Sequence, residues 1–302
     1  MDPASLTLRA WYELHFVVLF HADARRRTID EYAATINHWE RLTCNKPLAA
    51  ISAMDLAQFR SALAERLAVP TVNKNLRHLN HLLAKAGPPG PHNRDALNLL
   101  PMAAWAKQLR TFQRRPRAAG LSAIGAFYRV CTDPWWRAFV VCAFHLGSRV
   151  TALIHVRDAD VDWGRRLITL RAEHDKRRCE RVKPMSAAVV RHLIELRGCG
   201  LLQWPRSKTA FYYAWHRLER LAGFADDDRF TPHALKRACG TQLARAGVSP
   251  WAVRYMLDHA QRDVTGSHYI DPLDELRSVV DLLPDPSRKV LSCPNVEEEK
   301  QL

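Results

Sequence analysis

The most informative stretch of this chain is Thr231-Pro232-His233-Ala234-Leu235-Lys236-Arg237. A threonine followed by proline predicts a helix start, because the threonine can cap the helix and proline fits the first helical position. His233 and Lys236 are three positions apart and therefore share one face of that helix. Free N–H groups and the macrodipole favour anions at a helix N-terminus. The stretch thus predicts an anion-binding helix end.

A second candidate anion site lies upstream, in the sequence Leu146-Gly-Ser-Arg149. Gly147 is expected to end one helix and Ser148 to cap the next. Arg149 would then stand in the first turn of a helix, with a planar guanidinium that matches two phosphate oxygens.

The downstream sequence supplies a candidate nucleophile. Ser249-Pro250 predicts another helix start, and that helix is expected to end near His259. Tyr269 follows ten residues after His259, behind both anion sites. A tyrosine in a helical run is usually a core residue, but one that follows two anion sites is a candidate nucleophile.

The bulk composition favours a polyanionic partner. The 302 residues carry a net charge of +14, which points to nucleic acid first and to a membrane surface second. Both parts of the chain are basic: residues 1–117 carry a net charge of +8 and the remaining residues carry +6. Seven scattered cysteines without a Cys-x-x-Cys pair argue against a disulfide framework and against a zinc site.

The expected compartment is the cytoplasm. The cysteine usage fits a reducing environment, and the N-terminus shows no signal segment. The longest apolar stretches are too short to cross a bilayer, so no membrane partner is expected.

The predicted fold is mainly α with a small antiparallel β-sheet (α+β). A helical domain is expected over residues 1–110, a basic linker over 111–120, a second domain over 121–290 and a flexible acidic tail over 291–302. Residues 167–171 and 181–185 are the convincing strand candidates. A short helical stretch is expected around 97–109.

Candidate DNA contacts outside the two anion sites are basic side chains. Pro70 opens a predicted amphipathic helix whose polar face carries Lys74 and Arg77. The basic linker could cross a phosphate backbone. The set expected to contact DNA is Lys74, Arg77, Arg114, Arg115, Arg117 and Arg237.

The ordered motifs resemble those of the tyrosine recombinase (phage integrase) family over roughly residues 6–285. Gly147-Ser-Arg149 resembles the family's arginine turn, and Leu257-Asp-His259 resembles its Leu-Gly-His motif. His233 matches the family's first histidine and Tyr269 its nucleophile. The family's hairpin lysine stands eight residues before a proline, as Lys176 stands before Pro184, and Lys183 is the second choice. The first hundred residues resemble the family's core-binding domain.

Three departures from the family pattern bear on activity. Lys236 stands where the family has its second arginine, with Arg237 beside it, and lysine keeps the charge but loses the bidentate fork. Ala152 stands where an acidic residue is common. The spacing from His259 to Tyr269 is one residue longer than usual, in a polar loop that absorbs the insertion.

The resemblance implies a reaction and an assembly. Tyr269 would attack a DNA phosphodiester, form a 3′-phosphotyrosyl bond and release a 5′-hydroxyl, with no metal or other cofactor. Lys176 would protonate the leaving oxygen and His233 would assist proton transfer at the tyrosine. Arg149, Lys236 and His259 would stabilise the charge of the transition state. The expected partners are double-stranded DNA and three further copies, in a homo-tetramer on paired sites.

Two alternatives remain open from the sequence. A non-catalytic or attenuated DNA-binding protein derived from a recombinase is favoured by Lys236 and Ala152. A relaxing type IB topoisomerase would use similar chemistry without needing a specific site. The sequence specifies neither the DNA target nor the choice among integration, excision, resolution and transposition.

Overall fold

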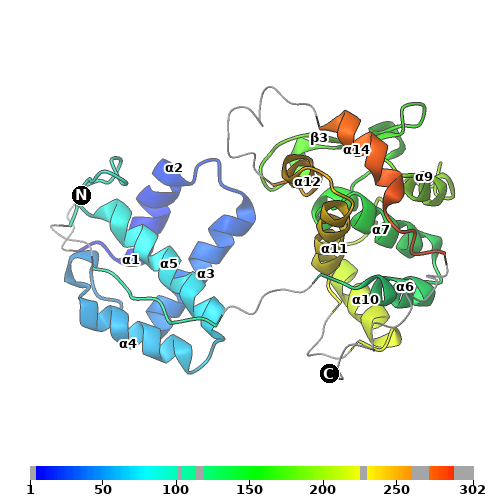
Figure 1. Ribbon diagram of the computed structural model, residues 1–302. Helices are drawn as coiled ribbons and strands as arrows, with labels where there is room; N and C mark the ends of the chain where they lie inside the picture. Colours follow the sequence, from blue (N-terminus) through cyan, green and yellow to red (C-terminus); the bar gives the residue numbers. More distant parts are fainter. Residues whose placement is uncertain (1–4, 101–103, 113–117, 225–229, 260–271, 289–302) are drawn as a thin grey trace, which may run out of the picture. The chain divides into compact units, whose positions relative to one another are not determined.

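The computed structural model describes residues 5–100, 104–112, 118–224, 230–259 and 272–288. The chain divides into two compact units, Met1–Arg114 and Arg115–Leu302 (Figure 1). Both are built mainly from helices, and the second also holds a three-stranded antiparallel sheet. The predicted fold class is therefore confirmed.

The first unit is helical. Ser52 begins one of its helices with a capping box, in which its hydroxyl accepts from the backbone of Asp55 and the Asp55 carboxylate accepts in return. Trp11 is fully buried, and its indole donates to the carbonyl of Leu82 at 3.1 Å. The described elements are α1 (Leu8–Trp11), the π-helical turn η1 (Tyr12–Phe16), α2 (Val17–Phe20), α3 (Arg26–Leu42), η2 (Leu48–Ala50), α4 (Ala53–Ala64) and α5 (Val69–Ala86).

The predicted helix around residues 97–109 is wrong. The described parts of this segment form no helix. Two asparagines of α5 bind its backbone instead: Asn80 bonds both the N–H and the carbonyl of Ala106, and Asn73 does the same at Leu109. These side chains satisfy backbone groups that a helix would have paired internally.

The second unit is arranged around α7, which contacts α6, α9 and α11 (Figure 1). Three of its helices begin at serines, Ser186, Ser207 and Ser249, and each serine side chain accepts a hydrogen bond from the first turn. The predicted helix start at Ser249 is thereby confirmed. The described helices are α6 (Leu121–Val130), α7 (Pro134–His145), α8 (Val150–Leu153), η3 (Asp158–Asp160), η4 (Ala172–His174), α9 (Ala187–Ile194), α10 (Lys208–Leu221), α11 (Pro232–Arg245), α12 (Pro250–Met256), α14 (Leu273–Val279) and η6 (Val280–Leu282).

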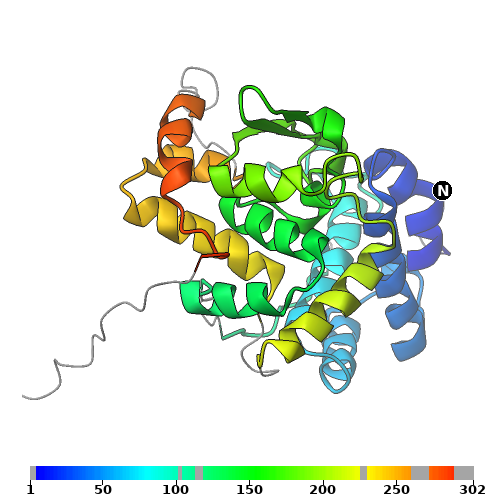
Figure 2. The same ribbon diagram turned by 90° about the vertical axis from the view of Figure 1, so that its right-hand side faces the viewer.

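The sheet has the order β1-β2-β3, formed by β1 (Val161–Asp162), β2 (Leu167–Leu170) and β3 (Arg181–Pro184). The two predicted strands are confirmed, while the two-residue β1 was not expected. Ile168 pairs with Lys183 and is fully buried, as is Lys183. Figure 2 shows this sheet at one end of the unit and α6 at the other.

The apolar face near the C-terminus packs on its own unit. Leu276, Val280 and Leu283 are buried and belong to the same core as α7 and α11. This apolar face is therefore buried within the protomer itself.

Some sequence expectations lie outside the described residues. These are Tyr269, the linker arginines Arg114, Arg115 and Arg117, and the acidic tail 291–302. In the part of the chain that the structure describes, no helix is both long and apolar enough to cross a membrane.

Replacing Gly147, at the turn after α7, is predicted to destabilise the second unit. Its φ is +57°, and a Cβ there would lie 2.9 Å from Leu257 Cδ2 and 3.0 Å from Cys239 Sγ. Gly198 has a φ of +78° with nothing within 4 Å of a Cβ, so it isolates the cost of backbone strain. We expect Gly198→Ala to lower the free energy of unfolding by about 1 kcal/mol. Gly147→Ala should cost roughly 3 kcal/mol, because overpacking adds to strain. Equal losses in urea titrations would contradict this packing argument.

Candidate active site

The N-terminus of α11 begins where the sequence predicts. Thr231 is the N-cap residue and Pro232 the first helical residue, although the Thr231 side chain makes no capping hydrogen bond. The two side chains expected to share an anion-binding face have different environments. His233 is exposed, whereas Lys236 is only 3% exposed.

The turn before α8 is built differently from the expectation. Ser148 was predicted to cap this helix, but the N-cap residue is Arg149, and its side chain makes no capping bond. Ser148 is buried, and its hydroxyl donates to the carbonyl of Leu146 and accepts from Lys183. With only four residues, α8 offers little macrodipole, so the affinity of this turn for anions rests on the guanidinium of Arg149.

Arg149 has an acidic partner that the family pattern did not indicate. Ala152 is buried and carries no carboxylate, but Asp175, which precedes the predicted hairpin lysine, reaches Arg149 from between β2 and β3. Its Oδ1 lies 3.3 Å from Arg149 Nη1. The Arg149 side chain is 33% exposed, so it is paired with Asp175 and still partly accessible to solvent. Lys176, the next residue, is exposed.

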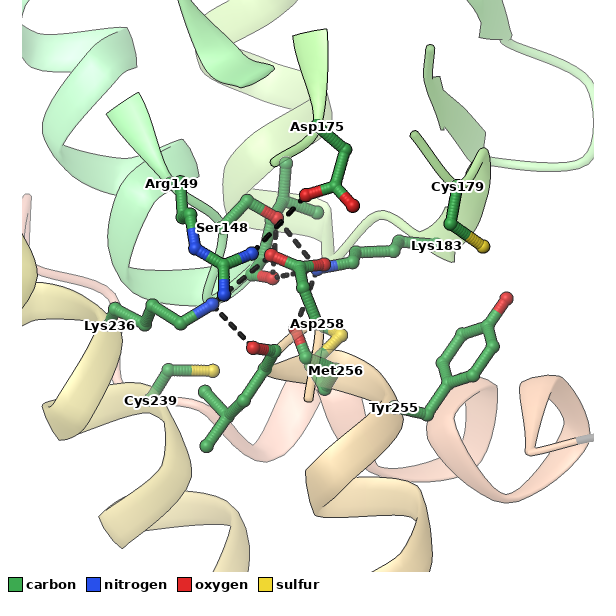
Figure 3. Close-up of polar contacts among 12 residues, drawn as sticks. Ser148, Arg149, Asp175, Cys179, Lys183, Lys236, Cys239, Tyr255, Met256 and Asp258 are labelled. Atoms are coloured by element: carbon green, nitrogen blue, oxygen red, sulfur yellow. Dashed lines mark hydrogen bonds and ion pairs between the residues drawn. The ribbon is translucent and has the colours of Figure 1, made fainter. Parts of the chain in front are cut away.

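Lys236 is held by the backbone and a carboxylate at the end of α12. Its Nζ donates to the carbonyl of Leu257 at 2.5 Å and to Asp258 Oδ2 at 3.1 Å (Figure 3). Burial lowers the pKa of Lys236 from 10.5 to about 8, against the opposing effect of Asp258. The ammonium is therefore close to its titration point near neutral pH.

Lys183 is the most deeply buried charged group of this cluster. It is 0% exposed, and its Nζ contacts the Leu146 carbonyl at 2.9 Å, the Ser148 hydroxyl at 2.6 Å and the Met256 carbonyl at 2.6 Å. It also lies 2.5 Å from Asp258 Oδ1. Lys183 thereby ties β3 to the Arg149 turn and to the end of α12, and Figure 3 shows it extending into this junction.

Asp258 lies between the two lysines. Burial alone would raise its pKa, but the ammonium groups of Lys183 and Lys236 outweigh burial and hold the pKa below its ordinary value. Its φ is +52°, a conformation that aspartate tolerates better than most residues and that glycine adopts freely. This position corresponds to the glycine of the Leu-Gly-His motif.

Two histidines complete the cluster. His233 and His259 are exposed residues, but partial burial of their rings lowers both pKa values, and the positive charges of Lys236 and Arg149 add to that effect. The pKa of His233 is also lowered by the neighbouring His259. The structure therefore brings four of the six predicted catalytic residues together, namely Arg149, His233, Lys236 and His259.

Sequence reasoning missed three functional neighbours: Asp175, Lys183 in its buried role, and Asp258. Asp258 carried a usable signal, since a carboxylate replaces the family's glycine while a lysine replaces its arginine. Opposite charges that appear together in adjoining motifs indicate a pair. The role of Asp175 had no such signal, because its spacing from Arg149 reflects only the path of the chain.

The predicted DNA contacts that the structure describes are all at least partly accessible. Arg77 is exposed and Lys74 partly exposed on α5. Arg237 is partly exposed and lines a hollow of about 650 Å³ together with Ala118, Arg245 and Val253.

Comparison with known proteins gives a consistent family. The description "Phage integrase family" matches residues 120–275, just over half of the 302-residue chain. The matched segment includes all six predicted catalytic residues.

Two curated relatives carry the same family's names. A putative tyrosine recombinase XerC of Pseudomonas aeruginosa is 34% identical over 128 residues, which cover 39% of this chain and 25% of that protein. A tyrosine recombinase XerD of Neisseria meningitidis serogroup B is 28% identical over 139 residues, covering 43% of this chain and 48% of the relative. The match therefore spans half or less of each relative's length.

Solved structures share the fold. A lambda integrase dimer bound to a COC′ core site aligns with a TM-score of 0.66 at 19% identity, over 89% of this chain and 79% of that one. A Tn1549 transposon integrase with a circular intermediate DNA gives 0.65 at 16% identity, over 85% and 93%. A lambda integrase tetramer bound to a Holliday junction gives 0.65 at 16% identity, over 97% and 82%.

Removing the buried ammonium should destabilise the second unit. We expect Lys183→Met to lower its free energy of unfolding by about 3 kcal/mol, because buried acceptors at Leu146, Ser148 and Met256 lose their donor. Lys208, an exposed lysine that donates to Thr151, is the control, and Lys208→Met should cost less than about 1 kcal/mol. Denaturant unfolding monitored by tryptophan fluorescence measures both; equal losses would refute the role of Lys183.

Proposed function

The chain belongs to the phage integrase family, and on that premise we propose that it is a site-specific DNA recombinase that cleaves and rejoins strands through a 3′-phosphotyrosyl bond. The observation that carries the proposal is the convergence of Arg149, His233, Lys236 and His259, which are electrostatically coupled and come from three separate segments. Such a cluster of cationic and titratable groups suits a phosphodiester, whose oxygens gain negative charge in the transition state.

The proposed reaction conserves the number of phosphate bonds. The Tyr269 hydroxyl attacks the phosphorus, a phosphotyrosyl P–O bond forms, and the P–O5′ bond breaks. The tyrosine proton passes toward His233, and the 5′ oxygen receives a proton from Lys176. Attack by the 5′-hydroxyl of a partner strand reverses these steps and releases the tyrosine.

The charge-stabilising role falls to three groups. Arg149 presents a braced but partly exposed guanidinium, Lys236 an ammonium at the base of the cluster, and His259 an exposed ring. Lys176 is favoured over Lys183 as the proton donor, because Lys176 is exposed whereas Lys183 is completely buried in contacts with its own unit.

The proposed partners are double-stranded DNA and further copies of the chain. The exposed basic side chains of the helical unit and the net charge of +14 support DNA binding. A homo-tetramer on paired sites is proposed by likeness to the lambda integrase tetramer. Because Leu276, Val280 and Leu283 are buried within one protomer, the contacts between protomers would use other surfaces. A DNA substrate would place the protein in the cytoplasm, at the nucleoid.

A second candidate function is DNA binding with little or no cleavage. Lys236 stands where the family has arginine, and its ammonium is bonded to Leu257 and Asp258 rather than open to a phosphate. If DNA does not displace these contacts, the protein would bind its site without reacting.

A nicked suicide duplex separates these functions. Cleavage close to the nick frees a short fragment that carries the new 5′-hydroxyl. When this fragment diffuses away, religation fails and the covalent adduct accumulates. We expect a protein–DNA adduct on denaturing gels, and its complete loss in Tyr269→Phe, which removes only the attacking oxygen. DNA binding by Tyr269→Phe should remain within about twofold, since a single hydroxyl contributes little to a phosphate-dominated interface.

The outcomes are distinct. Binding without an adduct would support the second candidate. Relaxation of supercoiled DNA without a target site would instead support a type IB topoisomerase.

The rate of cleavage should depend on the charge of Lys236. Because its pKa is about 8, the ammonium loses its proton as the pH rises from 7 to 9. kcat/KM reports groups of the free enzyme, so the wild-type value should fall about tenfold over this range relative to Lys236→Arg, whose guanidinium stays charged. The ratio of the two proteins cancels every titration that they share. A ratio that stays constant with pH would remove the Lys236 charge from the mechanism.

A further inference from the structure

The buried lysine–aspartate–lysine cluster goes beyond what the proposed reaction requires. Asp258 divides its two carboxylate oxygens: Oδ2 lies 3.1 Å from Lys236 Nζ, and Oδ1 lies 2.5 Å from Lys183 Nζ. All three side chains are at most 5% exposed. Burying three charged groups is costly unless each finds a partner, so this arrangement calls for an explanation in terms of position.

Lys183 is a rigid anchor for the carboxylate. Its Nζ contacts two carbonyls and a hydroxyl as well as Asp258, and these groups belong to the Arg149 turn and to the end of α12. An ammonium has three donors, and here fixed protein acceptors take them up. Asp258 is therefore held at one oxygen and has the other for Lys236.

Besides Asp258, the charged groups that act on Lys236 are the cations Lys183 on β3 and Arg149 before α8. Arg237 and His233 lie on its own helix α11 and His259 follows α12, and the pKa values of both histidines are below the ordinary value. Like charges at such short range favour loss of a proton from a buried lysine. Asp258 is the carboxylate that opposes this tendency, and it also fixes the direction of the ammonium (Figure 3).

We propose that Asp258 and Lys183 are positioning residues for the recombination reaction: Asp258 keeps the Lys236 ammonium charged and held beside Arg149, and Lys183 fixes Asp258 in place. The inference rests on the proposed function. A lysine has neither the fork nor the permanent charge of arginine, and the Asp258–Lys183 pair supplies both the orientation and the counter-charge that a lone lysine lacks.

The same contacts would have the opposite sign if Asp258 merely withheld Lys236 from the phosphate. Removing the carboxylate would then speed cleavage. The two roles are therefore separated by the direction of one measured change.

The central variant is Asp258→Asn, which keeps the size of the side chain and tolerates the left-handed backbone. With the suicide duplex at pH 7.5 and saturating DNA, we expect the rate constant of cleavage to fall about threefold, because lowering the pKa of Lys236 from about 8 by one unit reduces its charged fraction by that factor. KM for DNA should change less than about twofold, because most affinity comes from other phosphate contacts. The falling limb of the pH profile should move to lower pH, whereas structural damage would lower the rate equally at every pH.

Two further proteins make the test specific. Adding Lys236→Arg to Asp258→Asn should restore the rate at high pH, because guanidinium stays charged without a counter-ion. Asp160→Asn is the matched control: Asp160 pairs with Arg171 at 3.2 Å in the same unit, and its loss should leave cleavage unchanged. An unchanged or faster Asp258→Asn would overturn the proposal.

A charge-matched variant covers the case in which Asp258→Asn fails to fold. Lys183→Met with Asp258→Asn removes one positive and one negative group, so the cluster keeps its net charge. We expect this double variant to fold, with the loss of stability predicted for Lys183→Met, and to cleave more slowly than wild type because the Lys236 ammonium is no longer held in place. Its pH profile should shift less than that of Asp258→Asn, because a repelling cation is lost together with the carboxylate. Cleavage at the wild-type rate would overturn the proposal.

One measurement is independent of activity. The Cε resonance of Lys236, assigned by its absence in Lys236→Arg, reports the charge of the ammonium in DNA-free protein. We expect its titration to move to lower pH in Asp258→Asn and not in Asp160→Asn. If the wild-type protein forms no adduct but the titration is shifted in Asp258→Asn, the recombinase function is refuted and the Asp258–Lys236 coupling is preserved. If the titration is not shifted in Asp258→Asn, the coupling itself is refuted.

Discussion

Burying a charged group costs free energy unless it finds a partner, and the geometry of the candidate site follows from how its buried charges are paired. Lys183, Asp258 and Lys236 are withdrawn from water at the junction of β3, the Arg149 turn and the end of α12. When both lysines are protonated, two ammonium groups share one carboxylate, and the cluster carries one unit of positive charge at the proposed phosphate site. The same contacts that join these segments also hold the Arg149 turn and the His259 segment at fixed positions relative to Lys236.

Much of the architecture was predictable, because it depends on local chemistry. The starts of α11 and α12 follow from proline at the first helical position. The serine caps of α9, α10 and α12 follow from hydrogen bonds to backbone groups three residues away. The segment 104–112 was not predictable in this way. Its apolar spacing resembles a helix, but Asn73 and Asn80, more than twenty residues away, bind its backbone in a non-helical form. Tertiary contacts here override local preference.

The candidate site shows the same division. The order of Arg149, His233, Lys236 and His259 could be recognised from motifs, and the structure places these four together. Their partners could not be assigned from spacing alone. Asp175 supplies Arg149 with the carboxylate that Ala152 lacks, and it comes from the loop between two strands. The burial of Lys183 could not be predicted from its position in a strand. Side chains alternate between the two faces of a strand, and a lysine that faces inward needs a partner that the strand itself does not contain.

The asparagine contacts along α5 have a consequence for the tether between the two units. Asn73 binds the chain as far as Leu109, and on the other side Ala119 donates to the carbonyl of Ala234 in α11. The stretch from Leu109 to Ala119 extends to at most about 35 Å. In the proposed DNA complex, binding of one unit to a duplex would confine the other unit to a small volume around the same site. Its effective concentration there would be set by this short span rather than by the amount of protein in the cell.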